Sequence, residues 1–354
     1  MEHPLSREAL AYFDGLFPIQ GPERLTPQRG CSTVHSEANR ISGATQMYKD
    51  VLVPGSSNLP HAIPYQGSKR SLAPLIGPLI PPKIKTWFEP FAGSAAMTIY
   101  AAHHNRAEHF VIADSLGSIV ALWRAIVDEP DRVRDEYAAL WHGQQAGDHG
   151  YFNRVRERYN DGGNPVELLY LICRCVKNAV RFNAKGRFTQ SVDKRRLGMR
   201  PEKMAASVTA ISRLLRGRVE FRTGDWLQTT LDATPKDFIY MDPPYVGTSV
   251  GRDKRYHAQL TQDQVAAGVQ TMLERGLRFA LSYDGKTGEK TYSDPLPEQL
   301  GLTHLHLHAG ASSQATLVGK RAETIESLYL SPGLAEPVSG IIRRRRPEQA
   351  RLFA

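Results

Sequence analysis

Two apolar segments, separated by a glycine turn and a helical pattern, limit the fold of this chain most strongly. "IKTWFEPFAG" (84–93) is typical of a strand that runs into a turn, "SAAMTIYAAHH" (94–104) of a helix, and "HFVIAD" (109–114) of a second strand. A strand, a helix and a strand joined by short turns form a βαβ unit, which places parallel strands in one sheet with helices on its faces. A helical pattern follows over 118–141, and further strands are predicted at 219–226, 236–242 and 277–284. We therefore predict an α/β core.

The composition changes along the chain and suggests four parts. Residues 1–60 are rich in Pro, Gly and Ser without a sustained period, so we expect a weakly ordered extension. Residues 61–139 and 219–332 carry the α/β pattern, 140–218 form a charged, mainly helical insertion, and 333–354 form a basic tail.

The formal net charge of +9 favours a polyanionic partner or an anionic membrane surface. The chain has no run of about 18 apolar residues, so we expect no spanning helix. Its first residues do not resemble a signal peptide. The cysteines Cys31, Cys173 and Cys175 are few, odd in number and without a C-x-x-C pair. We therefore expect a reduced, cytoplasmic protein without a disulfide framework or zinc site.

Acidic or glycine-bearing turns end three of the predicted strands. Glu89 and Gly93 end the first, Asp114 the second and Asp242 a later one. Ligands of open α/β sheets bind outside the carboxyl ends of the strands, where a glycine turn permits close approach and a carboxylate can bind a ribose. This layout predicts a cofactor that contains adenosine. For Asp114, capping of the following helix is an alternative interpretation.

Five motifs occur in a fixed order: "PYQGSK" (64–69), "FEPFAGSAAM" (88–97), "FNAKGRF" (182–188), "GDW" (224–226) and "DPPY" (242–245). In this order the chain resembles the Dam-like alpha group of DNA adenine-N6 methyltransferases over residues 61–331. The resemblance implies a Rossmann-like sheet that binds S-adenosylmethionine, with an inserted, mainly helical target-recognition region that carries a β-hairpin. It implies no metal.

Positions that match the family's motifs are expected to bind the cofactor. Tyr65 and Lys69 match the aromatic and lysine of the first motif, and the turn from Glu89 to Ser94 matches the cradle of the methionine part. Asp114 is expected at the ribose, and Asp225 with Trp226 at the adenine; the family more often has phenylalanine at position 226. The predicted cofactor residues are Tyr65, Gly67, Lys69, Glu89, Pro90, Phe91, Ala92, Gly93, Ser94, Asp114, Asp225, Trp226 and Asp242.

The chemistry of an exocyclic amine explains the Asp-Pro-Pro-Tyr segment, residues Asp242, Pro243, Pro244 and Tyr245. The amine is a poor nucleophile because its lone pair is delocalised into the ring. A carboxylate and a backbone carbonyl can each accept one of its hydrogens, which localises the lone pair. Prolines hold that carbonyl rigidly and bring no N–H donor near the amine. Tyr245 offers a face on which a flipped base can stack.

The insertion is the predicted DNA reader. Its basic stretch resembles the family's segment that leads into the DNA-contacting hairpin. Arg181 and Asn183 have the shape for bidentate bonds to guanine and adenine edges, and nearby cations can neutralise phosphates. The alternative is a solvated charged face over Phe182 and Phe188. The predicted DNA contacts are Arg181, Asn183, Lys185, Arg187, Lys194, Arg195 and Arg196.

Two further features leave alternatives open. His304, His306 and His308 share one face of a predicted strand, which is either a solvated face or a metal site. Gln349, Leu352 and Phe353 in the basic tail resemble a peptide that binds bacterial sliding clamps.

The resemblance predicts a site-specific adenine methyltransferase of bacterial or phage origin, which acts on double-stranded DNA in the cytoplasm, alone or beside a restriction endonuclease. Related enzymes that act on cytosine-N4, RNA adenine or protein glutamine are one class of alternative. Asp242 argues against the cytosine and glutamine enzymes, which more often carry Ser or Asn there. A non-catalytic DNA-binding protein with the same fold is the second alternative, and Asp242, Asp114 and Lys69 argue against it.

Overall fold

The computed structural model describes residues 51–53, 59–146, 148–244, 260–287, 290–291, 294–311, 323–334 and 341–344. Tyr245, Gln349, Leu352 and Phe353 lie outside the described residues, so the predictions for them stay predictions. Within the described part, no helix is long and apolar enough to cross a membrane.

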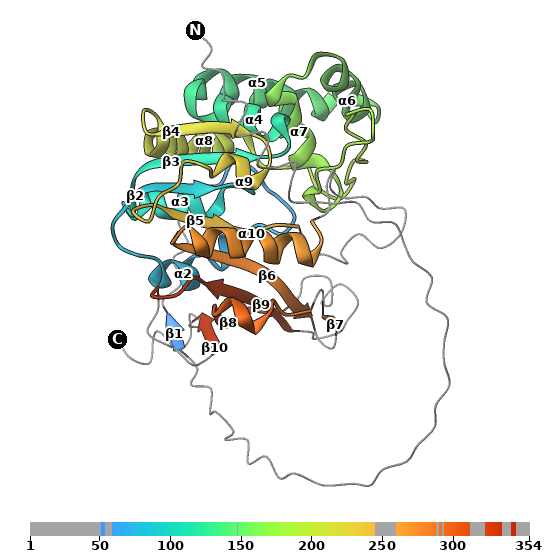
Figure 1. The fold of residues 1–354 in the computed structure, drawn as a ribbon. Helices are drawn as coiled ribbons and strands as arrows, with labels where there is room; N and C mark the ends of the chain where they lie inside the picture. The colour runs from blue at the N-terminus through green and yellow to red at the C-terminus, as the bar shows by residue number, and fades with distance from the viewer. Residues whose placement is uncertain are drawn as a thin grey trace, which may run out of the picture. The chain divides into compact units, whose positions relative to one another are not determined.

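The described strands form one mixed sheet in the order β1-β10-β8-β9-β6-β5-β2-β3-β4, and β7 pairs with β6 (Figure 1). The pairs β6–β9, β8–β9 and β6–β7 are antiparallel and the others are parallel. The strands are β1 (Val51–Val53), β2 (Ile84–Glu89), β3 (Ala107–Asp114), β4 (Val219–Thr223), β5 (Phe238–Met241), β6 (Phe279–Thr287), β7 (Lys290–Thr291), β8 (Thr303–Ala311), β9 (Glu323–Leu330) and β10 (Ile341–Arg344). The predicted α/β, Rossmann-like class is confirmed.

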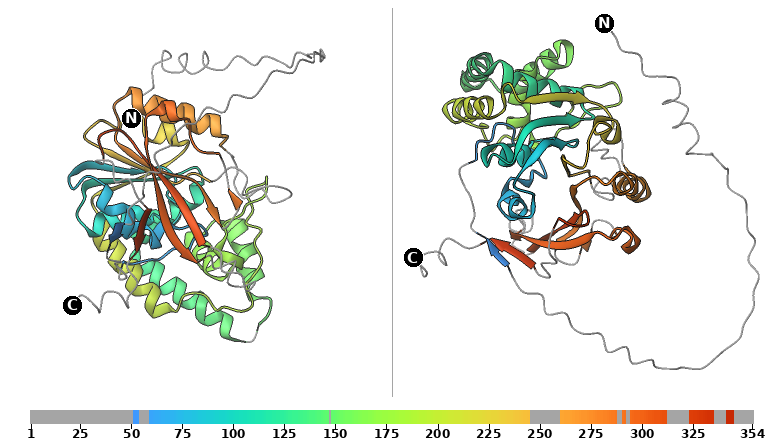
Figure 2. Two further views of the ribbon diagram at one scale, coloured as in Figure 1. Left: turned by 90° about the horizontal axis from the view of Figure 1, so that it is seen from below. Right: turned by 60° about the vertical axis from the view of Figure 1, so that its left-hand side comes forward.

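Helices cover both faces of this sheet, as the two further views in Figure 2 show. Alternate residues of a strand point to opposite faces, so Trp87 packs under α3 and α4 while its neighbour Phe88 belongs to the second core, beneath α10. The helices are η1 (Lys69–Ser71), α2 (Ala73–Ile76), η2 (Gly77–Leu79), α3 (Ala96–His103), α4 (Gly117–Asp128), α5 (Pro130–Gly143), η3 (Gln144–Ala146), α6 (Tyr151–Gly162), α7 (Pro165–Arg174), η4 (Val176–Asn178), α8 (Pro201–Leu215), α9 (Trp226–Thr229), α10 (Gln262–Glu274) and η5 (Glu298–Leu300).

One expectation about the elements was wrong. The helical pattern over 118–141 forms two helices, because Pro130 lacks an N–H and begins α5 after Glu129. The short strands β1 and β10, from the predicted N-terminal extension and basic tail, pair with each other in parallel at the end of the sheet.

The predicted insertion contains α6, α7 and a long connection before α8. That connection turns back on itself through two isolated antiparallel bridges, Cys175–Val192 and Phe182–Phe188, rather than through long hairpin strands. α8 packs against α3, α4 and α5, so the last part of the predicted insertion belongs to the helix layer over the sheet.

Candidate active site

A pocket opens at the carboxyl ends of the parallel strands β2, β3, β4 and β5. All thirteen residues predicted to bind the cofactor line it, together with Pro243 and Pro244. Their cofactor contacts stay predictions, but the structure brings all of them together. Sequence reasoning missed other lining residues, namely Gln66, Ser68, Ala96, Ser115, Leu116, Gly224, Tyr240 and Leu260.

The glycine turn after β2 is tied to the end of β3. Gly93 adopts a left-handed φ of 46°, and a Cβ there would lie 3.3 Å from the Tyr65 ring. Its N–H donates to Asp114 Oδ2 at 3.0 Å, and its carbonyl accepts from Trp123 Nε1 at 2.9 Å. A residue without a side chain is therefore needed where the turn, Tyr65 and the end of β3 meet.

Asp114 ends β3 and faces this turn. Its Oδ1 accepts from the Leu116 N–H at 2.9 Å, but Leu116 itself is the N-cap of α4, so the alternative in which Asp114 caps that helix is wrong. Burial raises the pKa of the Asp114 carboxyl, while bonds from the Leu116 and Gly93 N–H groups oppose that shift. The carboxylate is held in place by backbone donors at the strand end.

Glu89, the last residue of β2, is buried at the base of the pocket. Its Oε2 accepts from Thr98 through the backbone N–H at 2.6 Å and the Oγ1 hydroxyl at 2.5 Å. Burial raises the pKa of Glu89 to about 8, against the effect of the Thr98 bonds. A cationic ligand group would stabilise the ionised form of this carboxyl, because an opposite charge offsets the desolvation of a buried carboxylate.

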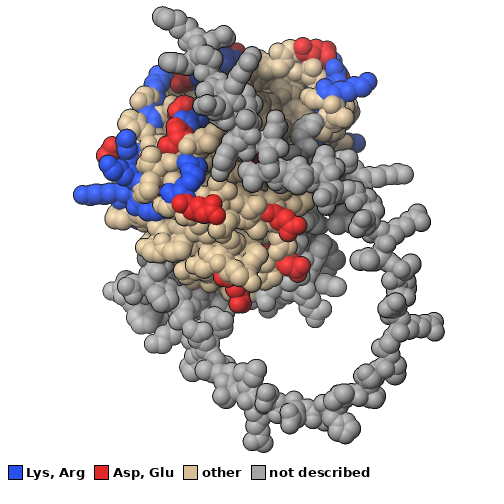
Figure 3. Space-filling model, viewed as in Figure 1, with Lys and Arg blue, Asp and Glu red and all other residues tan. Residues whose placement is uncertain are grey.

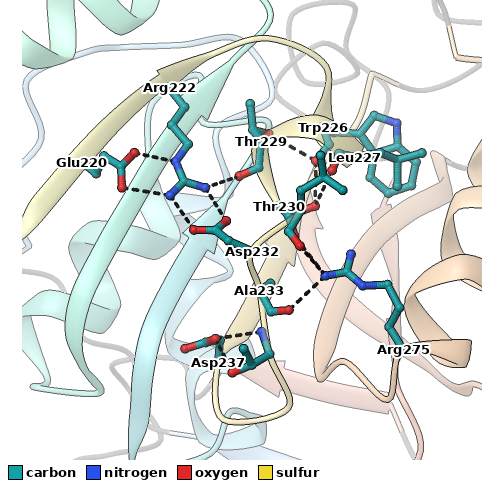
Figure 4. A network of polar contacts seen from close by, with 12 residues as sticks. Glu220, Arg222, Trp226, Leu227, Thr229, Thr230, Asp232, Ala233, Asp237 and Arg275 are labelled. Atoms are coloured by element: carbon teal, nitrogen blue, oxygen red, sulfur yellow. Dashed lines mark hydrogen bonds and ion pairs between the residues drawn. The ribbon is translucent and has the colours of Figure 1, made fainter. Parts of the chain in front are cut away.

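A short helix, α9, brings Asp225 and Trp226 to the pocket. Asp225 caps it by accepting from the Leu227 N–H at 2.8 Å, and the buried Trp226 ring lies 5.8 Å from the ring of Phe91. Two arginines hold the connection after α9 (Figure 4). Arg222 contacts Glu220 and Asp232, and Arg275 donates to the carbonyls of Leu231 and Ala233 at 2.8 and 2.9 Å.

Gly268 in α10 lies directly beneath the Trp226 ring. A Cβ on Gly268 would lie 2.3 Å from two carbon atoms of that ring, so Gly268→Ala forces the indole out of place. We expect Gly268→Ala to lower the free energy of unfolding by about 1–3 kcal/mol, as overpacking does. This effect opposes the gain of about 1 kcal/mol that alanine normally brings to a helix interior. Urea denaturation followed by circular dichroism measures the change.

Gly162→Ala is the matched control for that prediction. Gly162 is helical in α6, and a Cβ there would meet nothing within 4 Å. Its substitution should leave the protein equally or slightly more stable. Equal effects of the two substitutions would show that the Trp226 contact does not decide the outcome.

Lys69 and Asp242 form an ion pair across the pocket. Lys69 Nζ lies 2.7 Å from Asp242 Oδ1 and 2.9 Å from Oδ2, and it also donates to the Gly67 carbonyl at 3.2 Å. Burial raises the pKa of Asp242 to about 6, the Lys69 ammonium opposes this shift, and Glu326 adds to it. The Glu326 carboxylate, which sequence reasoning missed, lies 4.0 Å from Lys69 Nζ.

The turn at 183–187 lies at the tip of the predicted DNA-reading segment. Asn183 Oδ1 accepts from the N–H groups of Lys185 and Arg187, both at 3.0 Å, so this oxygen holds the turn together. Arg187 pairs with Glu157 and Asp161 of α6 at 2.7 and 3.1 Å. The structure therefore places the side chain of Arg187 against acidic partners of its own chain.

The second half of that segment contains cations that pair with an acidic side chain and others that are exposed. Arg195 and Arg196 both contact the buried Asp193. Lys194 and Lys185 are exposed. The base of the segment touches the pocket, because the Gln66 N–H donates to the Asn178 carbonyl at 3.2 Å.

Part of the positive charge lies at the opposite edge of the sheet. Lys85, Lys236 and Arg278 stand at the amino ends of β2, β5 and β6, where Arg278 donates to the Lys236 carbonyl at 2.7 Å. We call these three residues the amino-edge basic surface. Figure 3 shows Lys and Arg side chains gathered on the side of the molecule where β2, β3 and β4 lie in Figure 1. The net charge of the chain therefore does not come from the pocket side alone.

Known proteins are similar to this chain in sequence. Residues 65–304 match the model of the D12 class N6 adenine-specific DNA methyltransferases. The type II methyltransferase M1.LlaDCHI of Lactococcus lactis subsp. cremoris is 25% identical over 52% of this chain and 65% of its own length. The type II methyltransferase M.FokI of Planomicrobium okeanokoites is 25% identical over 75% of this chain and 42% of its own length.

Modification methylase StsI of Streptococcus sanguinis is likewise 25% identical, over 64% of this chain and 36% of its own length. The chain thus spans between about a third and two thirds of the length of these relatives. The family model covers more than half of the chain, and the matched segment contains the pocket motifs from Tyr65 to Asp242. The chain belongs to the family of D12 class N6 adenine-specific DNA methyltransferases.

Proposed function

We propose that this protein transfers a methyl group from S-adenosylmethionine to the N6 amine of an adenine that is flipped out of duplex DNA. The observation that carries the proposal is the Asp242 carboxylate at the pocket, followed by two prolines and held by Lys69. When bound, S-adenosylmethionine supplies an electrophilic methyl group. The residues of this chain orient the amine that receives it.

The pocket fits such a cofactor in chemical terms. The buried Glu89 carboxyl suits the amino group of the methionine part, because that cation would offset its desolvation. The Asp114 carboxylate at the end of β3 can accept hydrogen bonds from ribose hydroxyls, and Phe91 with Trp226 offers an aromatic wall for an adenine ring. Each of these contacts belongs to the proposal.

Asp242 prepares the amine for attack. Its carboxylate accepts one amine hydrogen and a backbone carbonyl held by the prolines accepts the other, so the nitrogen lone pair localises on the side of the methyl group. In the overall reaction the bond between the methyl group and the donor sulfur breaks and S-adenosylhomocysteine is released, while an N–CH₃ bond replaces one N–H bond of the amine and the proton passes to solvent. Holding the nitrogen about 3 Å from the methyl carbon in line supplies much of the remaining rate enhancement.

Expression of the full chain in a host without adenine methylation tests this function. Sequencing the host DNA with a method that detects methylated bases should reveal N6-methyladenine at one short sequence. The variant Asp242→Ala, expressed at the same level, is the control and should leave that sequence unmethylated. N4-methylcytosine in place of methyladenine would assign the reaction to the cytosine class, and DNA without any new modification would contradict methyl transfer to DNA.

We further propose that the exposed lysines of the connection between α7 and α8 contact phosphates. Lys185→Ala combined with Lys194→Ala should weaken DNA binding and reduce the slope of log K against log salt by about 2, because each lost phosphate contact removes about 0.9 from that slope. Fluorescence anisotropy at several salt concentrations measures the slope.

A pair of substitutions on the amino-edge basic surface provides the comparison for the lysine variant. Lys85 and Lys236 are also exposed lysines, at the opposite edge of the sheet. The variant Lys85→Ala with Lys236→Ala should keep the original slope. If this variant showed the reduced slope and the Lys185→Ala, Lys194→Ala variant kept the original slope, the DNA-binding surface would lie at the amino edge of the sheet.

A further inference from the structure

Glu326 lies beside the ion pair at the catalytic carboxylate, although it comes from a distant strand. Its Oε2 is 4.0 Å from Lys69 Nζ, and the side chain is 19% exposed. Lys69 is 6% and Asp242 21% exposed, so all three charges are largely removed from water. Charges in such surroundings interact more strongly than charges on the surface.

A bulge in β6 brings Glu326 to this position. Gly285 pairs with Glu326 and Ser282 pairs with Leu328, so β6 has one more residue than β9 between these pairs. Asp284 and Gly285 adopt φ angles of 53° and 134°, and a Cβ on Gly285 would lie 3.0 Å from the Ile325 carbonyl oxygen. Bulges beside active sites commonly redirect a side chain, and this one places the Glu326 carboxylate near Lys69.

A hydrogen bond holds the bulge in place. The Tyr329 hydroxyl donates to Asp284 Oδ2 at 2.5 Å, and the same hydroxyl accepts from the Leu296 N–H at 3.3 Å. Asp284 and Tyr329 are both buried. The strand irregularity is therefore a fixed part of the structure, and so is the approach of Glu326.

The hydrogens of Lys69 limit what Asp242 can do. An ammonium has three donors, and Lys69 directs bonds to both Asp242 oxygens and to the Gly67 carbonyl. An amine that binds Asp242 competes with this bidentate contact. Lys69 can move away from Asp242 only if another anion pairs with its ammonium group, because a buried cation without a partner is costly.

We propose that Glu326 is a positioning residue that binds the Lys69 ammonium together with Asp242. Its interaction with Lys69 becomes stronger when the adenine amine binds Asp242. This inference rests on the proposed methyl transfer. The two carboxylates and one ammonium also carry a net charge of −1 when ionised. That charge stabilises the positive charge that moves onto the amine nitrogen during transfer.

The groups that face Asp242 come from four elements. Lys69 lies on η1, Glu326 on β9, Glu89 on β2 and Tyr240 on β5, and each interacts electrostatically with Asp242. Burial raises the pKa of Glu89 to about 8 and that of Tyr240 well above its usual value. Near pH 6 both are therefore neutral, and Asp242 is the group that titrates in this range.

The test compares Glu326→Gln with the full wild-type chain in steady-state transfer of labelled methyl groups from S-adenosylmethionine to DNA, with both substrates saturating. Wild-type kcat should fall as the pH drops through about 6, because Asp242 loses its charge. In Glu326→Gln we expect kcat to fall about tenfold at pH 8. The acid limb of its pH–rate profile, where kcat falls with decreasing pH, should move to lower pH, since the Glu326 charge that raises the pKa of Asp242 is gone. S-adenosylmethionine affinity should change by less than about twofold.

Two variants separate positioning from a structural role. Glu326→Asp keeps the charge on a shorter side chain and should recover part of kcat, with a smaller shift of the acid limb. Glu298→Gln removes an exposed carboxylate outside the pocket and should match the wild type in both readouts. If Glu326→Gln does not fold, the direction of the Glu326→Asp shift decides the question.

An acid limb that stays at the wild-type pH in the folded Glu326 variants would overturn this inference while leaving methyl transfer itself intact. A wild-type protein that transfers no methyl group to DNA would instead overturn the proposed function. The two failures are therefore distinguishable.

Discussion

Replacing Asp242 with alanine should lower the rate of methyl transfer by about 10²–10³-fold, the usual cost of removing one oriented polar group from a reacting centre. The amine would then keep its delocalised lone pair. Cofactor binding should survive, because the other pocket residues remain and Lys69 keeps the Gly67 carbonyl and Glu326 as partners. Isothermal titration calorimetry with S-adenosylmethionine and a single-turnover assay measure the two quantities separately.

The control for this substitution is Asp294→Ala, which removes an exposed carboxylate that does not line the pocket. It should keep wild-type turnover. An Asp242→Ala enzyme with unchanged turnover would contradict the role of this carboxylate as an acceptor for the amine.

Replacing Lys69 with methionine should have the largest effect on stability. The substitution keeps the volume and removes the charge, which leaves Asp242 and Glu326 as neighbouring carboxylates in a largely buried site. Breaking a buried pair in this way costs about 3 kcal/mol, the low end for such pairs, because Asp242 is partly exposed. Transfer activity should fall as well, because protonated Asp242 no longer accepts from the amine.

The loss of stability in Lys69→Met should depend on pH with a definite sign. Without the ammonium, the folded-state pKa of Asp242 rises further above its unfolded value of about 3.9. A folded pKa above the unfolded one means that stability is lost as the pH rises. Urea denaturation should therefore show a larger deficit at pH 8 than at pH 5. The exposed Lys236→Met serves as the control, and an equal deficit at both pH values would argue against the unpaired carboxylates as the cause.

The pocket could be predicted from the sequence because parallel strands bring their carboxyl ends to one edge of the sheet. Glu89 and Asp114 end β2 and β3, and Asp242 directly follows β5, so their convergence follows from the topology alone. The first motif, from Tyr65 to Lys69, precedes the first of these strands, and it was placed by family resemblance rather than by a physical pattern.

Glu326 could not be predicted because its position depends on register. Gly285 within the strand pattern is compatible with a bulge, but it does not show how the extra residue of β6 sets the register with β9. The charge of Arg187 was visible in the sequence, but its acidic partners were not. Arg187 pairs with Glu157 and Asp161 on α6, an approach that depends on tertiary packing, whereas Arg195 pairs with Asp193, only two residues before it in the sequence.

The loop of residues 65–69 belongs to three sites at once. Tyr65 packs near Gly93 at the glycine turn, the Gln66 N–H donates to Asn178 at the base of the predicted DNA-reading segment, and Lys69 pairs with Asp242. If the proposed function holds, a shift of this loop changes the binding free energies of both S-adenosylmethionine and DNA. By thermodynamic reciprocity, any factor by which DNA alters the affinity for the cofactor is the factor by which the cofactor alters the affinity for DNA. This five-residue loop is where such a coupling would reside.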